Sequence, residues 1–327
     1  MYPLPLYIEC PYGLHQPYHP SVIYREGTLF GHQYWMAQTP YPIEDRKPYR
    51  DRYENPCIYY SDDGYVWNPI DGNPLDDLTN IEVQQGCYFS DPHLVVRGTV
   101  MELFYRFSDI HGTVIYKRFT VDGSHWSDRE LVVDLHSKLS HQLFGNDIIS
   151  PAVIWSEDKG YECWYVDDTY VNTQRKIRYI HSMDGINWSE SQLCTYDGDT
   201  LPWHLDVQDI AGELNMIVFD VDHQRLDWYV EKTKLDWKYR SRILVPSHRK
   251  GDFYECGLYR ACVIKVKDVY RVYFSAHNTQ ESSIGVIETY DRQHFAIRTG
   301  QSMIKTTINT LFLYYKSLRR RLKKYII

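Results

Sequence analysis

Alternation of apolar and polar residues, rather than a helical period, dominates this chain from its start to about Lys305. A short strand, a turn and a second strand rich in Tyr, Phe and Trp recur along it, as expected for half-buried β-strands. Five copies align: HPSVIY…YWMAQTPY, DPHLVVRGTVMELFYRFSD, SPAVIWSEDKGYECWYVDD, HLDVQDIAGELNMIVFDVD and RACVIKVKDVYRVYFSAH. Each unit has room for about four strands in roughly 50–70 residues, the size of one propeller blade.

A second pattern follows each copy and consists of a tight turn closed by an aromatic residue. The turns are SDDGYVW (61–67), TVDGSHW (120–126), SMDGINW (182–188), TKLDW (233–237) and TYDRQHF (289–295). Asp-Gly between alternating apolar residues predicts a hairpin turn. We therefore interpret the acids of these turns as structural, namely Asp62, Asp63, Asp122 and Asp184.

Together the two patterns predict an all-β fold, a five-bladed β-propeller over residues 1–302. The early segment LYIE (6–9) is a candidate to complete the sheet of the last blade and close the ring.

Residues 303–327 differ from the rest and predict a C-terminal basic amphipathic helix. Their apolar residues recur at helical spacing, and the segment holds seven basic residues and no acid. A helix of this kind often binds an anionic membrane surface. Docking on a partner or on the acidic propeller body is the alternative.

Charge and composition narrow the classes of ligand. The net charge of −7 argues against binding nucleic acid through its phosphates. Aromatic residues make up 15% of the chain. A β-rich core accounts for most of them, and a sugar-binding surface is expected to use a few.

The seven cysteines are scattered without a C-x-x-C pair, and the N-terminus shows no signal-peptide pattern. Both observations favour a cytoplasmic protein with free thiols, and the basic tail adds peripheral association with the inner membrane as an expectation.

The polar residues that precede the first strand of each copy carry the candidate chemistry. They are His19, Asp91, Ser150, His204 and Arg260, and the starts of innermost strands converge on one funnel in a propeller. We predict substrate-binding roles for five residues at this mouth: His19, Asp147, His204, Tyr259 and Arg260.

Cleavage of a glycosidic bond needs two carboxyl groups, one protonated and one ionised. The predicted catalytic candidates are Glu54, Asp91, Asp206 and Glu255, with structural hydrogen bonding as the alternative for Glu54 and Glu255. His19, His93 and His204 could meet and hold a metal, but we expect hydrogen bonding to substrate instead, and no cofactor. The chain contains no nucleotide-binding glycine loop, H-E-x-x-H or G-x-S-x-G motif.

The blade unit resembles that of the five-bladed propeller glycosidases, which include the arabinanase and xylosidase group, the fructan-cleaving group and the mannoside phosphorylases. The resemblance rests on a polar residue with Pro opening the inner strand and on the S-x-D-G-x-x-W turns, which are also similar to sialidase Asp-boxes. It implies an acid pair in the funnel. SDPHL at Asp91 resembles the second Asp-Pro motif of the family, and YEC at Glu255 is similar to a Glu-Cys motif that supplies the acid. The first blade of the family usually opens with a catalytic Asp, where this chain has His19.

The leading hypothesis is a glycoside hydrolase that acts on a surface, capsular or exopolysaccharide glycan. One alternative is a glycosyltransferase or phosphorylase of the same fold in membrane-associated polysaccharide synthesis, for which a sugar nucleotide would be a partner. Another is a non-catalytic propeller that only binds glycans.

Overall fold

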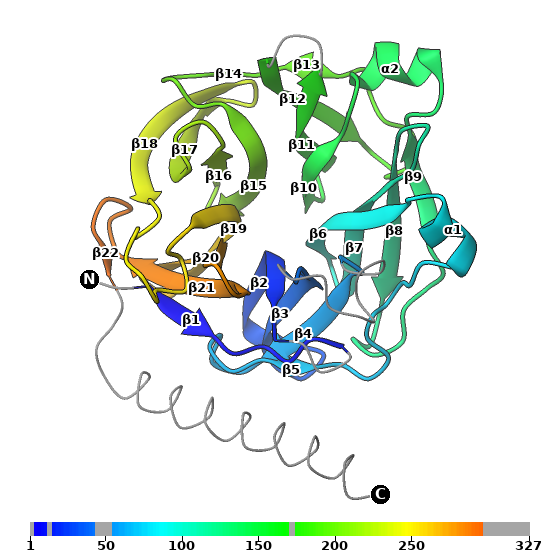
Figure 1. Ribbon diagram of the computed structural model, residues 1–327. Helices are drawn as coiled ribbons and strands as arrows, with labels where there is room; N and C mark the ends of the chain where they lie inside the picture. The colour runs from blue at the N-terminus through cyan, green and yellow to red at the C-terminus, as the bar shows by residue number, and fades with distance from the viewer. Residues whose placement is uncertain (1–2, 12–14, 43–53, 170–173, 297–327) are drawn as a thin grey trace, which may run out of the picture.

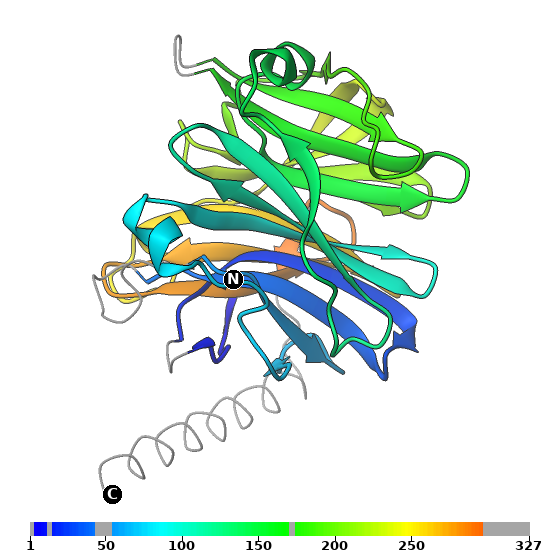
Figure 2. The ribbon, with the colours of Figure 1, turned by 90° about the vertical axis from the view of Figure 1, so that its right-hand side faces the viewer.

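The computed structural model describes residues 3–11, 15–42, 54–169 and 174–296. Five β-sheets stand around a central axis, as Figure 1 shows, and Figure 2 shows the same ring turned by 90°. Strand order and blade number therefore confirm the predicted all-β, five-bladed propeller. The predicted helix at 303–327 lies outside the described residues.

Each of the first three sheets is a four-stranded antiparallel meander in chain order. The first holds β2 (Pro17–Leu29), β3 (His32–Pro40), β4 (Cys57–Ser61) and β5 (Asn68–Pro69). The second holds β6 (Tyr88–Arg97), β7 (Val100–Ser108), β8 (Thr113–Thr120) and β9 (Glu130–Asp134). The third holds β10 (Ile149–Ser156), β11 (Gly160–Thr169), β12 (Gln174–Ser182) and β13 (Gln192–Leu193).

The last two sheets are five-stranded. The fourth contains β15 (Pro202–Ile210), β16 (Glu213–Asp220), β17 (Arg225–Thr233) and β18 (Asp236–Leu244), and β14 (Thr195–Tyr196) pairs in parallel with β18. The fifth contains β19 (Gly257–Val266), β20 (Val269–His277), β21 (Ser282–Thr289), β22 (Phe295–Ala296) and β1 (Leu4–Leu6). Two short helices that the sequence pattern did not predict, α1 (Asn80–Gln84) and α2 (Lys138–Phe144), lie between blades.

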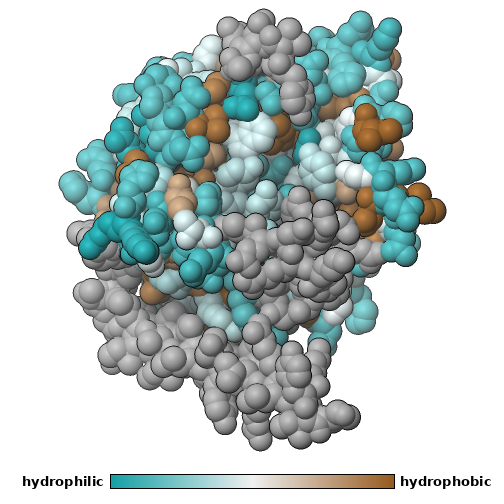
Figure 3. All heavy atoms as spheres, in the orientation of Figure 1, coloured by the Kyte–Doolittle hydropathy of each residue, from teal (hydrophilic) through white to brown (hydrophobic). Residues whose placement is uncertain are grey.

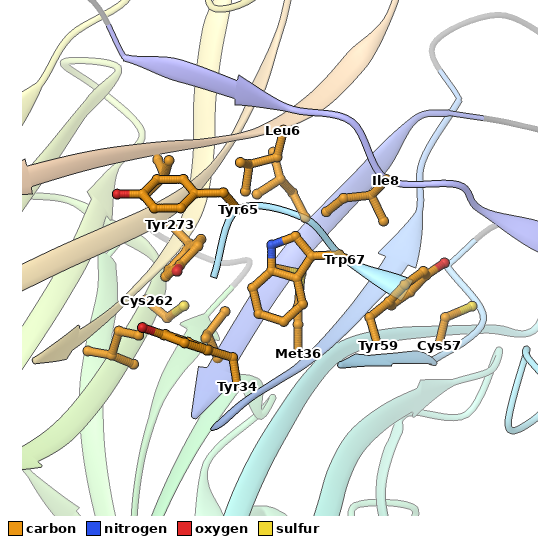
Figure 4. Packing of buried hydrophobic residues seen from close by; sticks show 14 residues of the cluster. Leu6, Ile8, Tyr34, Met36, Cys57, Tyr59, Tyr65, Trp67, Cys262 and Tyr273 are labelled. Carbon is orange, nitrogen blue, oxygen red and sulfur yellow. The ribbon is translucent and has the colours of Figure 1, made fainter. Parts of the chain in front are cut away.

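Strand β1 closes the ring by joining the first residues of the chain to the last blade. It pairs antiparallel with β21, with Leu4 opposite Val286 and Leu6 opposite Ile284. The predicted closing strand is thus present, but it ends at Leu6 instead of beginning there. Figure 4 shows the buried cluster beside it, which joins the first and fifth blades: Leu6, Ile8, Tyr34, Met36, Cys57, Tyr59, Tyr65, Trp67, Cys262 and Tyr273.

Three of the acids predicted to be structural, Asp63, Asp122 and Asp184, hold the repeated turns, whereas Asp62 contacts His32 Nδ1 at 3.0 Å instead. Asp122 Oδ1 accepts hydrogen bonds from the backbone N–H groups of Ser124 and His125, both at 2.8 Å. Asp63, Asp184 and Asp291 make the equivalent pair of bonds in their own turns. Each such carboxylate holds the turn in place of a backbone carbonyl.

All seven cysteines are free thiols, in agreement with the sequence-based expectation. Within the described residues, no helix has the length and apolar character needed to span a membrane.

Candidate active site

The polar candidate residues of the innermost strands lie at β-bulges. Strand pairing shifts register between Tyr18 and Ser21 in β2, and the equivalent shift occurs at the start of β6, β10, β15 and β19. His19, Asp91 and Ser150 occupy three of these bulges with φ of 52°, 52° and 54°, and proline follows each. We expected these residues just ahead of the strands, whereas the structure places them inside. A bulge re-aims one side chain without ending the strand, which explains the difference.

A cavity of about 220 Å³ lies where the five blades meet at this end of the inner strands. All five blades contribute to its wall, which combines aromatic, acidic and basic side chains. Its lining residues are His19, Tyr41, Glu54, Tyr88, Ser90, Asp91, Arg106, Asp147, Ile149, Trp203, His204 and Tyr259. Figure 3 shows residues of intermediate hydropathy near the middle of the face seen there, with hydrophilic and some hydrophobic residues around them.

Asp91 is a buried carboxylate surrounded by basic groups. Its Oδ1 lies 3.1 Å from His204 Nδ1 and 3.9 Å from Arg260 Nη1, and its Oδ2 accepts a 3.2 Å hydrogen bond from Ser90 Oγ. Burial favours the neutral acid, but His204, His19 and Arg260 outweigh burial and hold the pKa of Asp91 well below its usual value. Because arginine stays protonated, Arg260 exerts this effect even beside neutral imidazoles.

His19 is fixed by contacts on one side of its ring. Its Nδ1 lies 2.8 Å from Thr39 Oγ1 and 3.9 Å from Glu54 Oε2, and its backbone N–H donates to Ser275 Oγ at 2.8 Å. Burial lowers the pKa of His19 to about 3, so the ring is neutral at pH 7.

His204 approaches the same point from β15. Burial also lowers the pKa of His204, although Asp91 opposes this. Neither of its ring nitrogens has a hydrogen-bond partner, and neither does Asp91 Oδ1, because the 3.1 Å contact between them is not aligned as a hydrogen bond. The Tyr259 ring packs against His204 at 4.2 Å, and Tyr259 accepts a 2.7 Å hydrogen bond from Trp203 Nε1.

Glu54 enters the cavity from the segment before β4. It adopts φ of 67° and its backbone N–H donates to the Pro40 carbonyl at 2.7 Å. Burial raises the pKa of Glu54 well above its usual value, the charge of Asp91 adds to this, and Arg106 opposes it. The surroundings therefore shift the pKa values of two carboxyl groups in this cavity in opposite directions, that of Glu54 upward and that of Asp91 downward.

Asp147 lines the cavity as predicted, but its oxygens are largely occupied. Arg106 Nη2 donates to both of them, at 2.9 and 3.1 Å, and Thr113 Oγ1 donates at 2.6 Å. Arg106 was missed from the sequence, because it lies on the second strand of its blade. Its position opposite Ser90 in the β6–β7 pairing is what brings it to the funnel.

Asp206 and Arg260 lie in the buried layer next to the cavity rather than on its wall. Both are fully buried, and His93 joins them: its Nδ1 lies 3.3 Å from Asp206 Oδ1 and 3.4 Å from Arg260 Nη2. His93 Nε2 also contacts the Val153 carbonyl at 2.8 Å. Both ring nitrogens of His93 thus have contacts, and His93 does not meet His19 and His204 in the metal site that we considered from the sequence.

Glu255 lies outside the cavity. It sits in the segment between β18 and β19, where its Oε2 accepts a 2.8 Å hydrogen bond from the Gly251 N–H. Ser150, although at a bulge, donates to the Leu205 carbonyl at 2.9 Å and does not line the cavity.

A larger cavity, of about 530 Å³, opens at the opposite end of the inner strands. Most of its charged residues, among them Glu26, Asp209 and Lys267, are exposed, and its inner wall is formed by apolar residues such as Leu94 and Val153. Perturbed, converging acids and bases occur only at the smaller cavity among these two, so the smaller one is the candidate active site.

Two groups of described residues have the composition of a metal site. His19, Asp91 and His204 are buried, and one potential ligand atom from each lies within 4.8 Å of the others. The second group, Asp199, Asp220 and His223, is already contacted by Arg225, which donates to Asp199 at 2.7 Å and lies 3.2 Å from Asp220. Because the positive charge of Arg225 already lies beside two of its carboxylates, the second group is the poorer site for a cation.

No family model matches the sequence, and no curated protein matches it. Solved structures do match in fold. An N-acetylgalactosamine deacetylase from F. plautii, solved with blood group B trisaccharide, has a TM-score of 0.72 at 20% identity, over 88% of this chain and 94% of that one.

Glycoside hydrolases match over similar spans. A GH43_1 enzyme from Xanthomonas citri, solved with xylotriose, has a TM-score of 0.59 at 12% identity, over 88% of this chain and 89% of that one. A thermostable family-43 glycoside hydrolase has a TM-score of 0.60 at 13% identity, over 87% of this chain and 93% of that one. The chain thus has the five-bladed propeller fold of glycoside hydrolases, which confirms at the level of fold the resemblance stated from its sequence.

Proposed function

We propose that this chain is a carbohydrate-active hydrolase that acts on a glycan bound in the funnel cavity. The observation that carries the proposal is the pair of buried carboxyl groups, Glu54 and Asp91, that line one cavity and whose surroundings shift their pKa values in opposite directions. Two acids whose surroundings push their pKa values apart supply an acid and a base at one pH. The propeller fold shared with glycoside hydrolases supports the same class.

Cleavage of a glycosidic bond is the first candidate reaction. Glu54, protonated by burial, would donate its proton to the leaving glycosidic oxygen, while the ionised Asp91 would face the developing positive charge on the sugar or activate water. Tyr41, Tyr88 and Trp203 would pack against the apolar faces of the sugar rings, since these residues line the same cavity.

The substitution Glu54→Gln tests this assignment. It keeps the size of the side chain but cannot donate an acid proton, so kcat should fall by about 10²–10⁴-fold on an oligosaccharide that the wild type cleaves. Glu255→Gln is the matched control, because Glu255 lies outside the cavity, and it should keep wild-type kcat. Equal activity of Glu54→Gln and the wild type would remove Glu54 from the mechanism.

Removal of an acyl group from an N-acylated sugar is the second candidate reaction. Two observations favour it: His19 stands where the first blade of the glycosidases has a catalytic Asp, and a structurally similar protein is named an N-acetylgalactosamine deacetylase. The products separate the two reactions. Release of acetate with the glycan chain intact indicates deacylation, whereas new reducing ends without acetate indicate glycosidic cleavage. Turnover that requires a sugar nucleotide or phosphate would instead identify the transferase or phosphorylase alternative, and saturable binding without any product would identify a glycan-binding propeller.

For the setting in the cell, we propose from the sequence pattern a cytoplasmic protein that binds the inner membrane through residues 303–327 and acts on a surface, capsular or exopolysaccharide glycan. Deletion of residues 303–327 should abolish co-sedimentation with anionic liposomes and leave hydrolysis of soluble oligosaccharides unchanged. Co-sedimentation equal to that of the full chain would contradict the membrane role.

A further inference from the structure

Three electron-pair donors meet in the funnel cavity, each from a different blade. His19 lies on β2, Asp91 on β6 and His204 on β15, and none of the three is more than 3% exposed. Asp91 Oδ1 and His204 Nδ1 are 3.1 Å apart. Two ligands bound at about 2.1 Å to one tetrahedral ion lie about 3.4 Å apart, so this spacing fits a shared ion.

The buried polar atoms that lack a partner at this point destabilise the folded state unless a ligand binds them. Asp91 Oδ1 and both ring nitrogens of His204 are buried without a hydrogen-bond partner. Each unsatisfied buried polar atom destabilises the folded state by an amount comparable to a lost hydrogen bond. A water molecule has two protons to donate, whereas the carboxylate and the two neutral imidazoles offer three lone pairs. A cation can accept all three at once.

Neighbouring residues orient the donors for this purpose. With its proton on Nδ1, His19 donates to Thr39 Oγ1 at 2.8 Å and leaves the lone pair of Nε2 open. Ser90 Oγ donates to Asp91 Oδ2 and leaves Oδ1 open. Hydrogen bonds to the far side of each ligand are the usual outer contacts of protein metal sites.

Arg260, the nearest fixed positive charge, does not close the site. Its Nη1 is 3.9 Å from Asp91 Oδ1, beyond hydrogen-bond distance, and donates instead to the Pro92 carbonyl at 2.9 Å. The negative charge of Asp91 is therefore available to a second cation.

We propose that His19, Asp91 and His204 bind one divalent transition-metal ion in the funnel. Two imidazoles and one carboxylate suit zinc, iron or manganese, whereas calcium and magnesium prefer oxygen ligands throughout. Three protein ligands leave at least one position for water or substrate, which is the arrangement of catalytic rather than structural metal sites.

The ion would decide between the two candidate reactions, and this consequence rests on the proposed function. Glycosidic cleavage by two carboxyl groups needs no metal, whereas a metal-bound water with a lowered pKa suits attack on a carbonyl carbon. In deacylation the bound water would lose one proton to solvent and its oxygen would bond to the acyl carbon, while Glu54 would donate its own proton to the leaving nitrogen as the carbon–nitrogen bond of the amide breaks. Glu54 would then regain a proton from solvent. Acetate and a free amino sugar result, without oxidation or reduction.

Metal binding can be measured without any substrate. The full chain is treated with EDTA, desalted and titrated with ZnCl₂ and with MnCl₂ by calorimetry, and the bound metal is counted by mass spectrometry. We expect one ion per chain and a higher Tm with metal present, because the ion binds only the folded state. His204→Ala should weaken binding at least 100-fold. Thr39→Val keeps every ligand and should weaken it by about 10–100-fold.

His223→Ala is the matched control, since it removes a histidine from the second, Arg225-occupied group, and it should bind metal like the wild type. Circular dichroism of each metal-free variant establishes that it is folded, and Thr39→Val provides the test if His204→Ala does not fold. No bound ion in the wild type, or equal affinity of the wild type, His204→Ala and Thr39→Val, would overturn the metal site. Metal binding without hydrolysis of any glycan would leave the site standing and refute the proposed function. Hydrolysis of a glycan by a wild type that binds no ion would refute the metal site and leave the proposed function standing.

Discussion

Two aspartates, each from a motif that recurs in the blades, have lowered pKa values for different physical reasons. Asp122, in an outer turn, is exposed, and hydrogen bonds from the backbone and side chain of His125 and from the Ser124 N–H lower its pKa. Asp91, at an inner bulge, is buried, and neighbouring basic groups lower its pKa against the effect of burial. The first carboxylate completes its own turn, whereas the second keeps an oxygen without a hydrogen-bond partner. A satisfied acid is structural, and an unsatisfied buried one is available to a ligand.

The same substitution at each of the two aspartates should separate these roles, and its effect on kcat is the largest that we predict. Asp91→Asn keeps the volume of the side chain but removes the charge, so kcat should fall by about 10²–10⁴-fold while the protein stays folded. Asp122→Asn should leave kcat unchanged and lower Tm slightly, because the amide is a weaker acceptor for the turn N–H groups. Steady-state kinetics and thermal unfolding of both variants measure this. Full activity of Asp91→Asn would show that the unsatisfied acid has no part in the reaction.

Replacing the glycine of an outer turn tests how tightly that turn packs against the neighbouring blade. Gly123 has φ of 80°, and a Cβ there would lie 2.6 Å from the Trp35 ring. The fifth turn carries Arg292 at the same position with φ of 61°, so the backbone conformation alone accepts a side chain. Gly123→Ala should therefore cost about 3 kcal/mol in the free energy of unfolding, mainly through overpacking against Trp35.

Gly98→Ala is the control for backbone strain without contact. Gly98 has φ of 61° and nothing within 4 Å of an added Cβ, so the loss should be about 1 kcal/mol. Chemical denaturation of both variants gives the two values. Equal losses would mean that packing against Trp35 adds nothing to the strain.

The same contrast explains how much of the fold and of the site could be predicted from the sequence. Turns and strand pairs are local, so their residue patterns predicted five blades, the structural acids and an N-terminal closing strand. The funnel was partly predictable, because His19, Asp91, His204 and Tyr259 open inner strands that must converge.

Other funnel residues depend on pairing between strands, which no local pattern records. Arg106 reaches the cavity from the second strand of its blade, and Trp203 and Tyr88 lie next to bulges whose register the sequence does not reveal. Glu255 was chosen by resemblance to a short motif, and the structure places it in an outer segment. The catalytic roles of Glu54 and Asp91 stay predictions.

The last prediction concerns pH, and it tests whether the inner histidines are neutral as their burial requires. Burial lowers the pKa of His19 from 6.5 to about 3. Between these values the unfolded chain binds a proton at this position and the folded chain does not, so the free energy of unfolding falls as the pH drops from 6.5 towards 3. His19→Gln should make this fall shallower without removing it, because the pKa of His204 is lowered as well. His181→Gln, at an exposed histidine, is the control and should keep the wild-type slope. Denaturant unfolding at a series of pH values measures the slopes. A slope in His19→Gln equal to that of the wild type would mean that folding does not change the pKa of His19, and so would contradict the burial effect.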